Sequence, residues 1–317
     1  MKMDEWTIQT MPAQSGRIVL ITGANSGIGY ESAVALAQQG AHVVMACRNL
    51  TKGEEAQQAL LVRVPKASTD LLQLDLGNLQ SIHTFAQTFN EKYARLDVLM
   101  NNAGIMAPPY SHTVDGFEAQ IGTNHLGHFA LTGLLLPPLL QTPQSRIVTV
   151  SSYANYFGWI NFADLQSERR YNGWLAYCQS KLANLLFALE LQRKLEAAHA
   201  DARSIAVHPG HAATNLQSHP ANWFDALWLS AANVVIAQNA EMGAMYQLFA
   251  ATAPEARGGE FYGPKYVTRG PVARAKLTRR ARDARAAAKL WQISEELTGV
   301  HYEAVAQKWR AASTTAS

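Results

Sequence analysis

The 317-residue sequence has only two cysteines, Cys47 and Cys178, and no hydrophobic run long enough to span a membrane. Two cysteines make neither a disulfide framework nor a metal-ligand set, so we expect a reducing compartment, the cytoplasm. The first fifteen residues carry acids and no apolar core, which argues against a signal peptide. The apolar stretch 129–140 is short and contains Pro137 and Pro138, so it predicts a buried helix that kinks or stops.

The sequence also lacks a strong excess of charge of either sign, because its formal net charge is only +3. Nothing in this composition indicates a nucleic-acid partner or an anionic membrane partner. One basic run, residues 269–289, predicts a solvated loop and helix face, with a phosphate or acidic-partner site as the alternative. What the chain does have is a hydrophobic fraction of 48%, which is enough for one large folded domain.

Short β-rich runs alternate with helical patterns along most of the chain. The expected strands are residues 17–22, 41–46, 71–74, 97–100, 146–150, 204–207 and 260–262. This alternation predicts an α/β fold, a single Rossmann-type doubly wound parallel sheet of about seven strands with helices on both faces. We expect the domain to cover residues 16–311, after an N-terminal extension (1–15) and before a flexible tail (312–317).

The first of these strands runs into a glycine-rich turn that opens a helix. Glycine allows positive φ and close approach of the backbone to a ligand, and a helix N-terminus favours a pyrophosphate. We therefore predict that a dinucleotide binds here, with a plain structural turn as the alternative. The residues expected to contact it are Gly23, Asn25, Ser26, Gly27, Ile28 and Gly29.

The end of the second strand indicates which dinucleotide binds. An acid there would hydrogen-bond the ribose 2′-hydroxyl of NAD, whereas an arginine accommodates the 2′-phosphate of NADP. This strand ends in Arg48 and carries no acid there, and a guanidinium matches a phosphate in charge and in its forked donors. We predict NADPH/NADP+ as the cofactor, with NADH less favoured; an ordinary surface arginine is the alternative.

A later helical stretch brings a phenol and an amine together. Tyr177 and Lys181 are four residues apart, so they share a helix face. A nearby ammonium favours the phenolate and should lower the phenol pKa from its usual value of roughly 10. A tyrosine tuned in this way can pass a proton to or from a carbonyl oxygen near neutral pH. Taken alone, the pattern is common and usually marks an exposed pair.

Polar and glycine-rich turns follow three of the expected strands. Ser151 and Ser152 follow the fifth strand, residues 101–104 end the fourth, and Pro209-Gly210 ends the sixth. Ligands bind at this carboxyl edge of such sheets. A serine there can orient a substrate carbonyl, although loop capping is the common role of a serine pair.

Together these motifs resemble those of the short-chain dehydrogenase/reductase family, and they stand in the family's order over roughly residues 16–215. The matching positions are Thr22-Gly23, Gly27-Ile28-Gly29, Asp75, Asn101-Asn102-Ala103-Gly104, Asn124, Ser152, Tyr177, Lys181, Pro209-Gly210 and Thr214.

The resemblance implies a role for each residue. Tyr177 would be the acid/base, Ser152 would orient the substrate, and Asn124 would hold a water that relays protons from the lysine. Lys181 would also bind the nicotinamide ribose, and Asp75 would contact the adenine. The remaining cofactor contacts would be Leu76, Asn102, Ala103, Gly104, Pro209, Gly210 and, on the nicotinamide side, Thr214.

The long separation between Ser152 and Tyr177 is similar to that in the retinol-dehydrogenase-like and WW-domain-oxidoreductase-like branch. The sequence departs from membrane-bound retinol dehydrogenases in lacking their N-terminal membrane anchor, so a retinoid substrate is not carried over. Many relatives pair through helices packed against the fourth and fifth strands, which leaves a homodimer open.

The segment after the sixth strand, residues 215–240, is expected to cover the cofactor and the substrate. It carries Trp223, Phe224 and Trp228, side chains that more often serve packing than recognition. If they line the pocket, the substrate is a hydrophobic aldehyde, ketone or alcohol, and the reaction is hydride transfer between it and the nicotinamide.

Two other classes of protein are the alternatives to this enzyme. A non-catalytic NADP(H)-binding redox-sensing regulator on the same fold would not need the set of Ser152, Tyr177 and Lys181. A methyltransferase has a similar sheet, but the spacing of the glycines and the presence of Arg48 argue against it.

Overall fold

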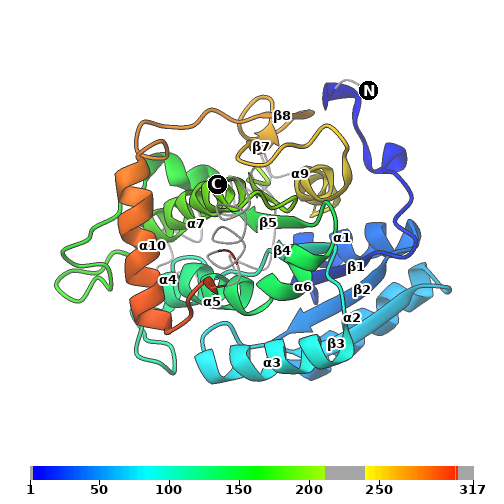
Figure 1. Ribbon diagram of the computed structural model, residues 1–317, viewed down its shortest axis with the longest axis horizontal. Coiled ribbons are helices and arrows are strands. Elements are labelled where there is room, and N and C mark those ends of the chain that lie inside the picture. The colour runs from blue at the N-terminus through cyan, green and yellow to red at the C-terminus, as the bar shows by residue number, and fades with distance from the viewer. Residues whose placement is uncertain (1–2, 211–239, 304, 306–317) are drawn as a thin grey trace, which may run out of the picture.

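The computed structural model describes residues 3–210, 240–303 and 305 of the chain. Its centre is an eight-stranded sheet in the order β3-β2-β1-β4-β5-β6-β7-β8 (Figure 1). The strands are β1 (Ile18–Thr22), β2 (His42–Cys47), β3 (Ser68–Gln73), β4 (Val98–Asn101), β5 (Arg146–Val150), β6 (Arg203–Val207), β7 (Phe261–Pro264) and β8 (Val272–Arg274). Neighbouring strands are parallel, except that β8 runs antiparallel to β7. The expected Rossmann-type sheet is confirmed, with one more strand than the seven predicted.

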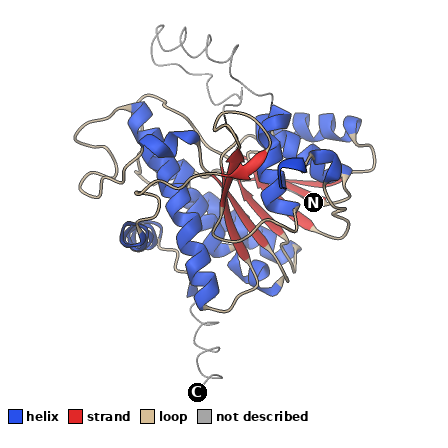
Figure 2. Cartoon of the chain, turned by 90° about the horizontal axis from the view of Figure 1, so that it is seen from above, coloured by secondary structure: helices blue, strands red, loops and turns tan. Residues whose placement is uncertain are grey.

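Helices cover both faces of the sheet (Figure 2). They are α1 (Gly27–Gln38), α2 (Leu50–Arg63), α3 (Leu79–Lys92), α4 (Ala119–Ile121), α5 (Gly127–Leu134), α6 (Leu136–Gln141), α7 (Gly173–Ala197), α9 (Ala240–Thr252) and α10 (Ala284–Thr298). Short 3-10 turns are η1 (Met3–Glu5), η2 (Ile8–Thr10) and η4 (Tyr153–Phe157), and η3 (Gly122–Leu126) is a π-helical turn.

The two faces of the sheet carry separate apolar cores, because successive residues of a strand point to opposite sides. Val19 and Ile21 of β1 lie in the core shared with α1, α2 and α9. Leu20, between them, lies in the core shared with α3, α5, α6 and α7. Both faces are therefore buried, as the continuous apolar runs of the strands predict.

The strand order reverses direction between β1 and β4, since β2 and β3 lie on one side of β1 and β5 and β6 on the other. In open α/β sheets, ligands bind in the crevice at such a switch point, beyond the carboxyl ends of the strands. Here those ends are the turns after Thr22, Asn101 and Val150.

The apolar stretch 129–140 forms two helices rather than one. Helix α5 ends at Leu134, and α6 begins at Leu136 with prolines in its first turn. A proline is tolerated there because the first amides of a helix have no intrahelical partner. The predicted interruption is confirmed.

Helix α10 lies across α7 and α5 (Figure 1). Asp283 caps its N-terminus by accepting hydrogen bonds from two amides, and Gly299 caps its C-terminus with a φ of 66°. Its Trp291 packs against Phe129, Phe187 and Tyr302. No helix in the described ranges has the length and apolar character that crossing a bilayer requires.

Candidate active site

The candidate site is built around α7, the helix that follows the inserted stretch. Asn172 caps this helix by accepting a hydrogen bond from the amide of Leu175. One turn into the helix, the side chain of Tyr177 is only 6% exposed. Lys181 lies on the same face, with its Nζ 5.7 Å from the centroid of the Tyr177 ring. The predicted pair is therefore buried, unlike the exposed pair that a Tyr–Lys spacing of four usually marks.

Lys181 is held at the end of β5. Its Nζ donates a hydrogen bond of 3.3 Å to the carbonyl oxygen of Val150. Burial lowers the pKa of Lys181 to about 8. An ammonium has three donors, and Nζ has no other hydrogen-bond partner among the described residues. Two N–H groups thus remain free to meet a ligand.

Gly104, in the turn after β4, approaches this ammonium closely. A Cβ built on Gly104 would stand 3.3 Å from Lys181 Nζ and 3.1 Å from Asn124 Oδ1. The absence of a side chain keeps open the space between the lysine and the asparagine.

The pKa of Tyr177 moves in the opposite direction to the predicted one. Burial raises the pKa of the Tyr177 phenol to about 12, and a hydrogen bond with the Ser152 side chain lowers it by a smaller amount. The prediction that Lys181 lowers this pKa was wrong, because burial dominates the shift and Lys181 is not among its causes. The phenol is protonated at neutral pH, which is the form needed to give a proton to a carbonyl oxygen.

The two serines after β5 have different roles. Ser151 Oγ donates a hydrogen bond of 2.7 Å to the carbonyl oxygen of Lys181, so it fixes α7 against the strand. Ser152 caps η4, where its Oγ accepts from the amide of Ala154. Its hydroxyl also reaches Tyr177. The capping role of Ser152 is confirmed, and its role in orienting a substrate stays a prediction.

Asn124 lies in the π-helical turn η3, where its side chain is fully engaged. Its Oδ1 accepts from the amide of Ile105, and its Nδ2 donates to the carbonyl of Ile105 and to Ser180 Oγ. These bonds tie the turn after β4 to both η3 and α7. The main-chain carbonyl of Asn124 is then the group that it can offer to a water.

The glycine turn after β1 packs directly on the turn after β4. Gly23 has a φ of 67°, and a Cβ on Gly29 would stand 2.5 Å from both Gly23 O and Asn102 Nδ2. The Thr22 hydroxyl accepts hydrogen bonds from the amides of Asn102 and Ala103, at 2.9 and 3.0 Å. No side chain larger than hydrogen fits at Gly29, because the turn after β4 and the backbone of Gly23 already fill that space.

The other turn residues also lie at this edge. Gly27 has a φ of 55°. Ser26 stands at the N-cap of α1 without a side-chain capping bond, and Ile28 is buried in the first turn. The backbone amide of Asn25 lies close to the Cys47 thiol and favours its thiolate. Burial has the larger effect and raises the pKa of this thiol to about 11.

Arg48 follows β2 directly and is exposed. Its neighbour Cys47 meets the amides of Ala24 and Asn25, so Arg48 stands beside the glycine turn. Within the described residues its guanidinium has no acidic partner within 4 Å, and Gln73 donates a hydrogen bond to its carbonyl oxygen, not to its side chain. The guanidinium is thus free for an anion.

The remaining predicted contacts divide between described and undescribed parts of the chain. Asp75 accepts from the amide of Gly77 in the loop after β3, and Leu76 is buried beside it. Pro209 and Gly210 follow β6, and Gly210 has a φ of 72°. Thr214 and residues 215–239 lie outside the described residues.

Three buried side chains near the site were missed in the sequence. His128 lies one turn after Asn124, Asn184 donates to the same Val150 carbonyl as Lys181, and His208 follows β6. Burial lowers the pKa of His128 and that of His208 to about 4. The pair His125 and His128 in an apolar stretch was the available signal, since polar residues in such a stretch need buried partners.

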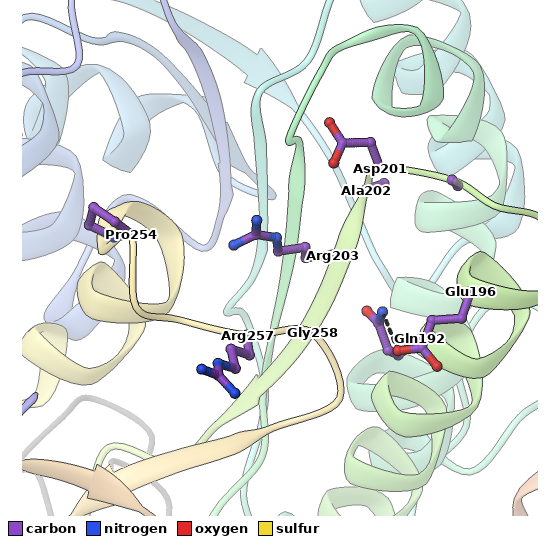
Figure 3. A pocket seen from close by; sticks show the side chains of 9 residues that line it. Gln192, Glu196, Asp201, Ala202, Arg203, Pro254, Arg257 and Gly258 are labelled. Carbon is purple, nitrogen blue, oxygen red and sulfur yellow. Dashed lines mark hydrogen bonds between the residues drawn. The ribbon is translucent and has the colours of Figure 1, made fainter.

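A hollow of ≈ 440 Å³ lies elsewhere, at the amino end of β6 (Figure 3). It is lined by Gln192, Glu196, Arg203 and Arg257, among others. The hollow lies at the start of β6, whereas Pro209 and the candidate site lie beyond its end. The two are therefore separate. The described residues hold no cluster of three metal-ligating side chains.

The fold and this strand-edge site define a dehydrogenase of the short-chain class. Residues 17–223 match the family described as short chain dehydrogenase, and the chain belongs to that family of oxidoreductases. It is 42% identical over 288 residues to retinol dehydrogenase 12 of Homo sapiens, covering 91% of this chain and 88% of the relative. For retinol dehydrogenase 11 of Homo sapiens the identity is 41% over 287 residues, covering 90% and 86%. The retinol-dehydrogenase-like resemblance is confirmed.

Solved structures agree with this assignment. The crystal structure of an uncharacterised protein from Mycobacterium paratuberculosis has a TM-score of 0.78 and 45% identity, covering 94% of this chain and 98% of that one. The NADP active-site complex of RhlG from Pseudomonas aeruginosa has a TM-score of 0.62 and 25% identity, covering 78% and 94%.

Proposed function

We propose that this chain transfers a hydride between NADP(H) and the carbonyl or alcohol carbon of a hydrophobic aldehyde, ketone or alcohol. The observation that carries this proposal is the buried pair on α7. The protonated phenol of Tyr177 and the ammonium of Lys181 lie one turn apart, beside Gly104 at the switch point of the sheet.

The residues at the switch point fit a dinucleotide. The glycine turn opens helix α1, whose N-cap Ser26 makes no side-chain capping bond, and the exposed guanidinium of Arg48 stands beside it. When bound, NADPH supplies the hydride, and the protein supplies orientation and charge. The residues proposed to hold it are Gly23, Asn25, Ser26, Gly27, Ile28, Gly29, Arg48, Asp75, Leu76, Asn102, Ala103, Gly104, Tyr177, Lys181, Pro209, Gly210 and Thr214.

In the reducing direction, Tyr177 donates its proton to the substrate oxygen while the Ser152 hydroxyl holds that oxygen by a hydrogen bond. Lys181 uses its free N–H groups to bind the ribose, and it returns a proton to Tyr177 through water. The carbonyl oxygen of Asn124 holds that water. Each of these steps uses a polar group that is buried or hydrogen-bonded at the site.

An apolar substrate is supported by the surface around the catalytic hydroxyls. Tyr153 follows Ser152 directly and contacts Phe157, with ring centroids 5.5 Å apart. Trp174 packs on Tyr177, with ring centroids 5.8 Å apart. These three aromatic side chains are between 38% and 50% exposed. Exposed aromatic groups beside a reactive centre mark a surface for an apolar ligand. The names of the relatives, retinol dehydrogenases 11 and 12, agree in kind with such a substrate.

We further propose that residues 16–311 form one domain and that the protein works in a reducing compartment, the cytoplasm. Both cysteines are free and buried, which suits such a compartment.

Replacement of Tyr177 by Phe tests the proposed function. Loss of one proton donor should lower kcat by at least about 10³-fold, while NADPH still binds. Turnover is followed by NADPH absorbance with a panel of aldehydes and ketones of graded size. Cys178→Ser, the next residue on α7, is the control and should keep most of the activity. An active Tyr177→Phe enzyme would refute the mechanism.

A further inference from the structure

His128 is a buried histidine whose two ring nitrogens both have partners. It lies in the first turn of α5 and is 1% exposed. Its Nδ1 stands 2.9 Å from the carbonyl oxygen of Asn124, and its Nε2 stands 2.9 Å from Thr22 Oγ1. One imidazole therefore joins the glycine turn of the proposed cofactor site to the main chain of the proposed catalytic asparagine.

The partners fix the tautomer of this ring. A carbonyl oxygen can only accept a hydrogen bond, so Nδ1 carries the proton and donates to Asn124. Nε2 is then an acceptor, and the Thr22 hydroxyl donates to it. This leaves the two lone pairs of Thr22 Oγ1 for the amides of Asn102 and Ala103, at 2.9 and 3.0 Å.

The hydrogen bonds of the His128 ring and the Thr22 hydroxyl are therefore all satisfied by one assignment of donors and acceptors. The alternative acceptor for the Thr22 hydroxyl, the carbonyl of Met100, is farther away, at 3.3 Å. Burial, against the hydrogen bond to the Asn124 carbonyl and with a smaller contribution from the charge of Lys181, lowers the pKa of His128 to about 4. At neutral pH the ring is uncharged, so it is an orienting group and no carrier of protons.

We propose that His128 is a positioning residue that holds the Asn124 carbonyl at a fixed place relative to the cofactor turn. The proposal rests on the proposed function, because it concerns the oxygen to which the relay water binds. In the π-helical turn, Gly127 N–H bonds back to Gly122 O, so the register of the backbone differs from that of an α-helix. The bond from His128 Nδ1 therefore holds the Asn124 carbonyl oxygen from a side chain, in a turn where the regular α-helical register is interrupted.

The tautomer gives a test that is independent of turnover. In a histidine-labelled sample, long-range ¹⁵N–¹H NMR spectra at pH 7 should show His128 with its proton on Nδ1. Titration should leave this ring neutral down to about pH 5. A proton on Nε2, or protonation near the usual histidine pKa of about 6.5, would overturn the proposal.

A pair of substitutions tests the positioning role itself. In His128→Asn, the amide nitrogen stands as many bonds from Cα as Nδ1 and can still donate to the Asn124 carbonyl. In His128→Leu, both bonds are lost. We expect kcat to fall by tenfold or more in His128→Leu, as about 1 Å of misplacement does at other sites, with the substrate KM changed less than threefold. His128→Asn should recover most of kcat.

Leu131→Ala is the matched control for simple destabilisation. Leu131 is fully buried on the same helix, in the core beneath the sheet, and its contacts there are apolar. It should lower the melting temperature as much as His128→Leu and leave kcat per folded molecule unchanged. Only His128→Leu should raise the solvent deuterium isotope effect on kcat, because the proton relay becomes slower.

The outcomes separate the two proposals. If the wild type reduces no carbonyl with NADPH, the proposed function fails, and the NMR result alone decides whether the His128 link exists. If the wild type is active and His128→Leu keeps its kcat, or loses no more than Leu131→Ala, the positioning role is wrong.

Discussion

Arg48 is the single side chain on which the choice of cofactor depends. It is exposed and stands beside the glycine turn. Replacement by Asp should reverse the preference, because a carboxylate repels the 2′-phosphate and accepts from a 2′-hydroxyl. We expect the NADPH/NADH ratio of kcat/KM to fall by about 100-fold or more, since charge-assisted bonds each contribute about 1.5–3 kcal/mol. Lys52→Asp, which puts the same charge on the exposed face of α2, is the control. An unchanged ratio would remove Arg48 from the site.

The buried charge of Lys181 lowers the free energy of unfolding of the protein. Its pKa is lowered from 10.5 to about 8 by burial, so the folded state binds its proton less tightly than the unfolded state. Between pH 8 and 10.5 the unfolded chain holds more protons, and stability therefore rises with pH in that window. Below pH 8 the full cost of the buried charge is present.

Lys181→Met should therefore be inactive and more stable. At pH 7 the free energy of unfolding should increase by up to about 3 kcal/mol, and the gain over the wild type should shrink above pH 10. Urea unfolding at the two pH values measures both. An equal gain at pH 7 and pH 10.5 would mean that the buried charge is not its cause.

At the scale of elements, the largest side chain by which α10 packs on the rest of the protein is Trp291. Trp291 is 5% exposed and contacts Phe129, Phe187 and Tyr302. Trp291→Ala should cost about 3–5 kcal/mol of stability through the cavity that it leaves. Gln292→Ala, on the exposed face of the same helix, should change the free energy of unfolding by less than about 0.5 kcal/mol. Equal effects of the two would show that α10 is not packed as described.

The elements that the sequence predicted are those with a strong local signal. β1, β5 and β6 are continuous apolar runs because both faces are buried, and their bounds agree with the predicted ones to within one residue. β8 was missed because three residues form a strand only through their pairing with β7. β3 begins at Ser68, earlier than predicted, because an edge strand can start with exposed polar residues.

In the site too, features set by local sequence were predicted, and features set by tertiary contacts were not. Helical spacing alone predicted that Tyr177 and Lys181 share a face. The pKa of the phenol depends on how deeply α7 is buried, which no local pattern contains. Asn124 in the π-helical turn bonds to Ile105 and Ser180, and His128 bonds to Thr22 of β1. These partners are distant in the chain, so the sequence did not reveal them.

At the scale of the whole molecule, three buried histidines make stability depend on acid. Burial lowers the pKa of His125 to about 3, and those of His128 and His208 to about 4. Because these values lie below the usual 6.5, the unfolded chain binds more protons as the pH falls, and stability decreases from about pH 6.5 downward.

Near pH 5, three protons taken up on unfolding correspond to a loss of about 4 kcal/mol per pH unit. Urea unfolding at pH 7, 6 and 5 measures this slope, and calorimetry in two buffers counts the protons. The exposed His83 serves for comparison, since His83→Gln should leave the slope unchanged. A flat stability between pH 7 and 5 would contradict the burial of these rings.

The position of α10 in the chain has a consequence for synthesis. The helix is made long after α5 and α7, whose aromatic side chains it covers. Until α10 has been synthesised, Phe129 and Phe187 expose an apolar surface that chaperones or neighbouring nascent chains can bind. We therefore expect a chain that ends before Trp291 to aggregate, even though its dinucleotide turn and Tyr177 have already been translated.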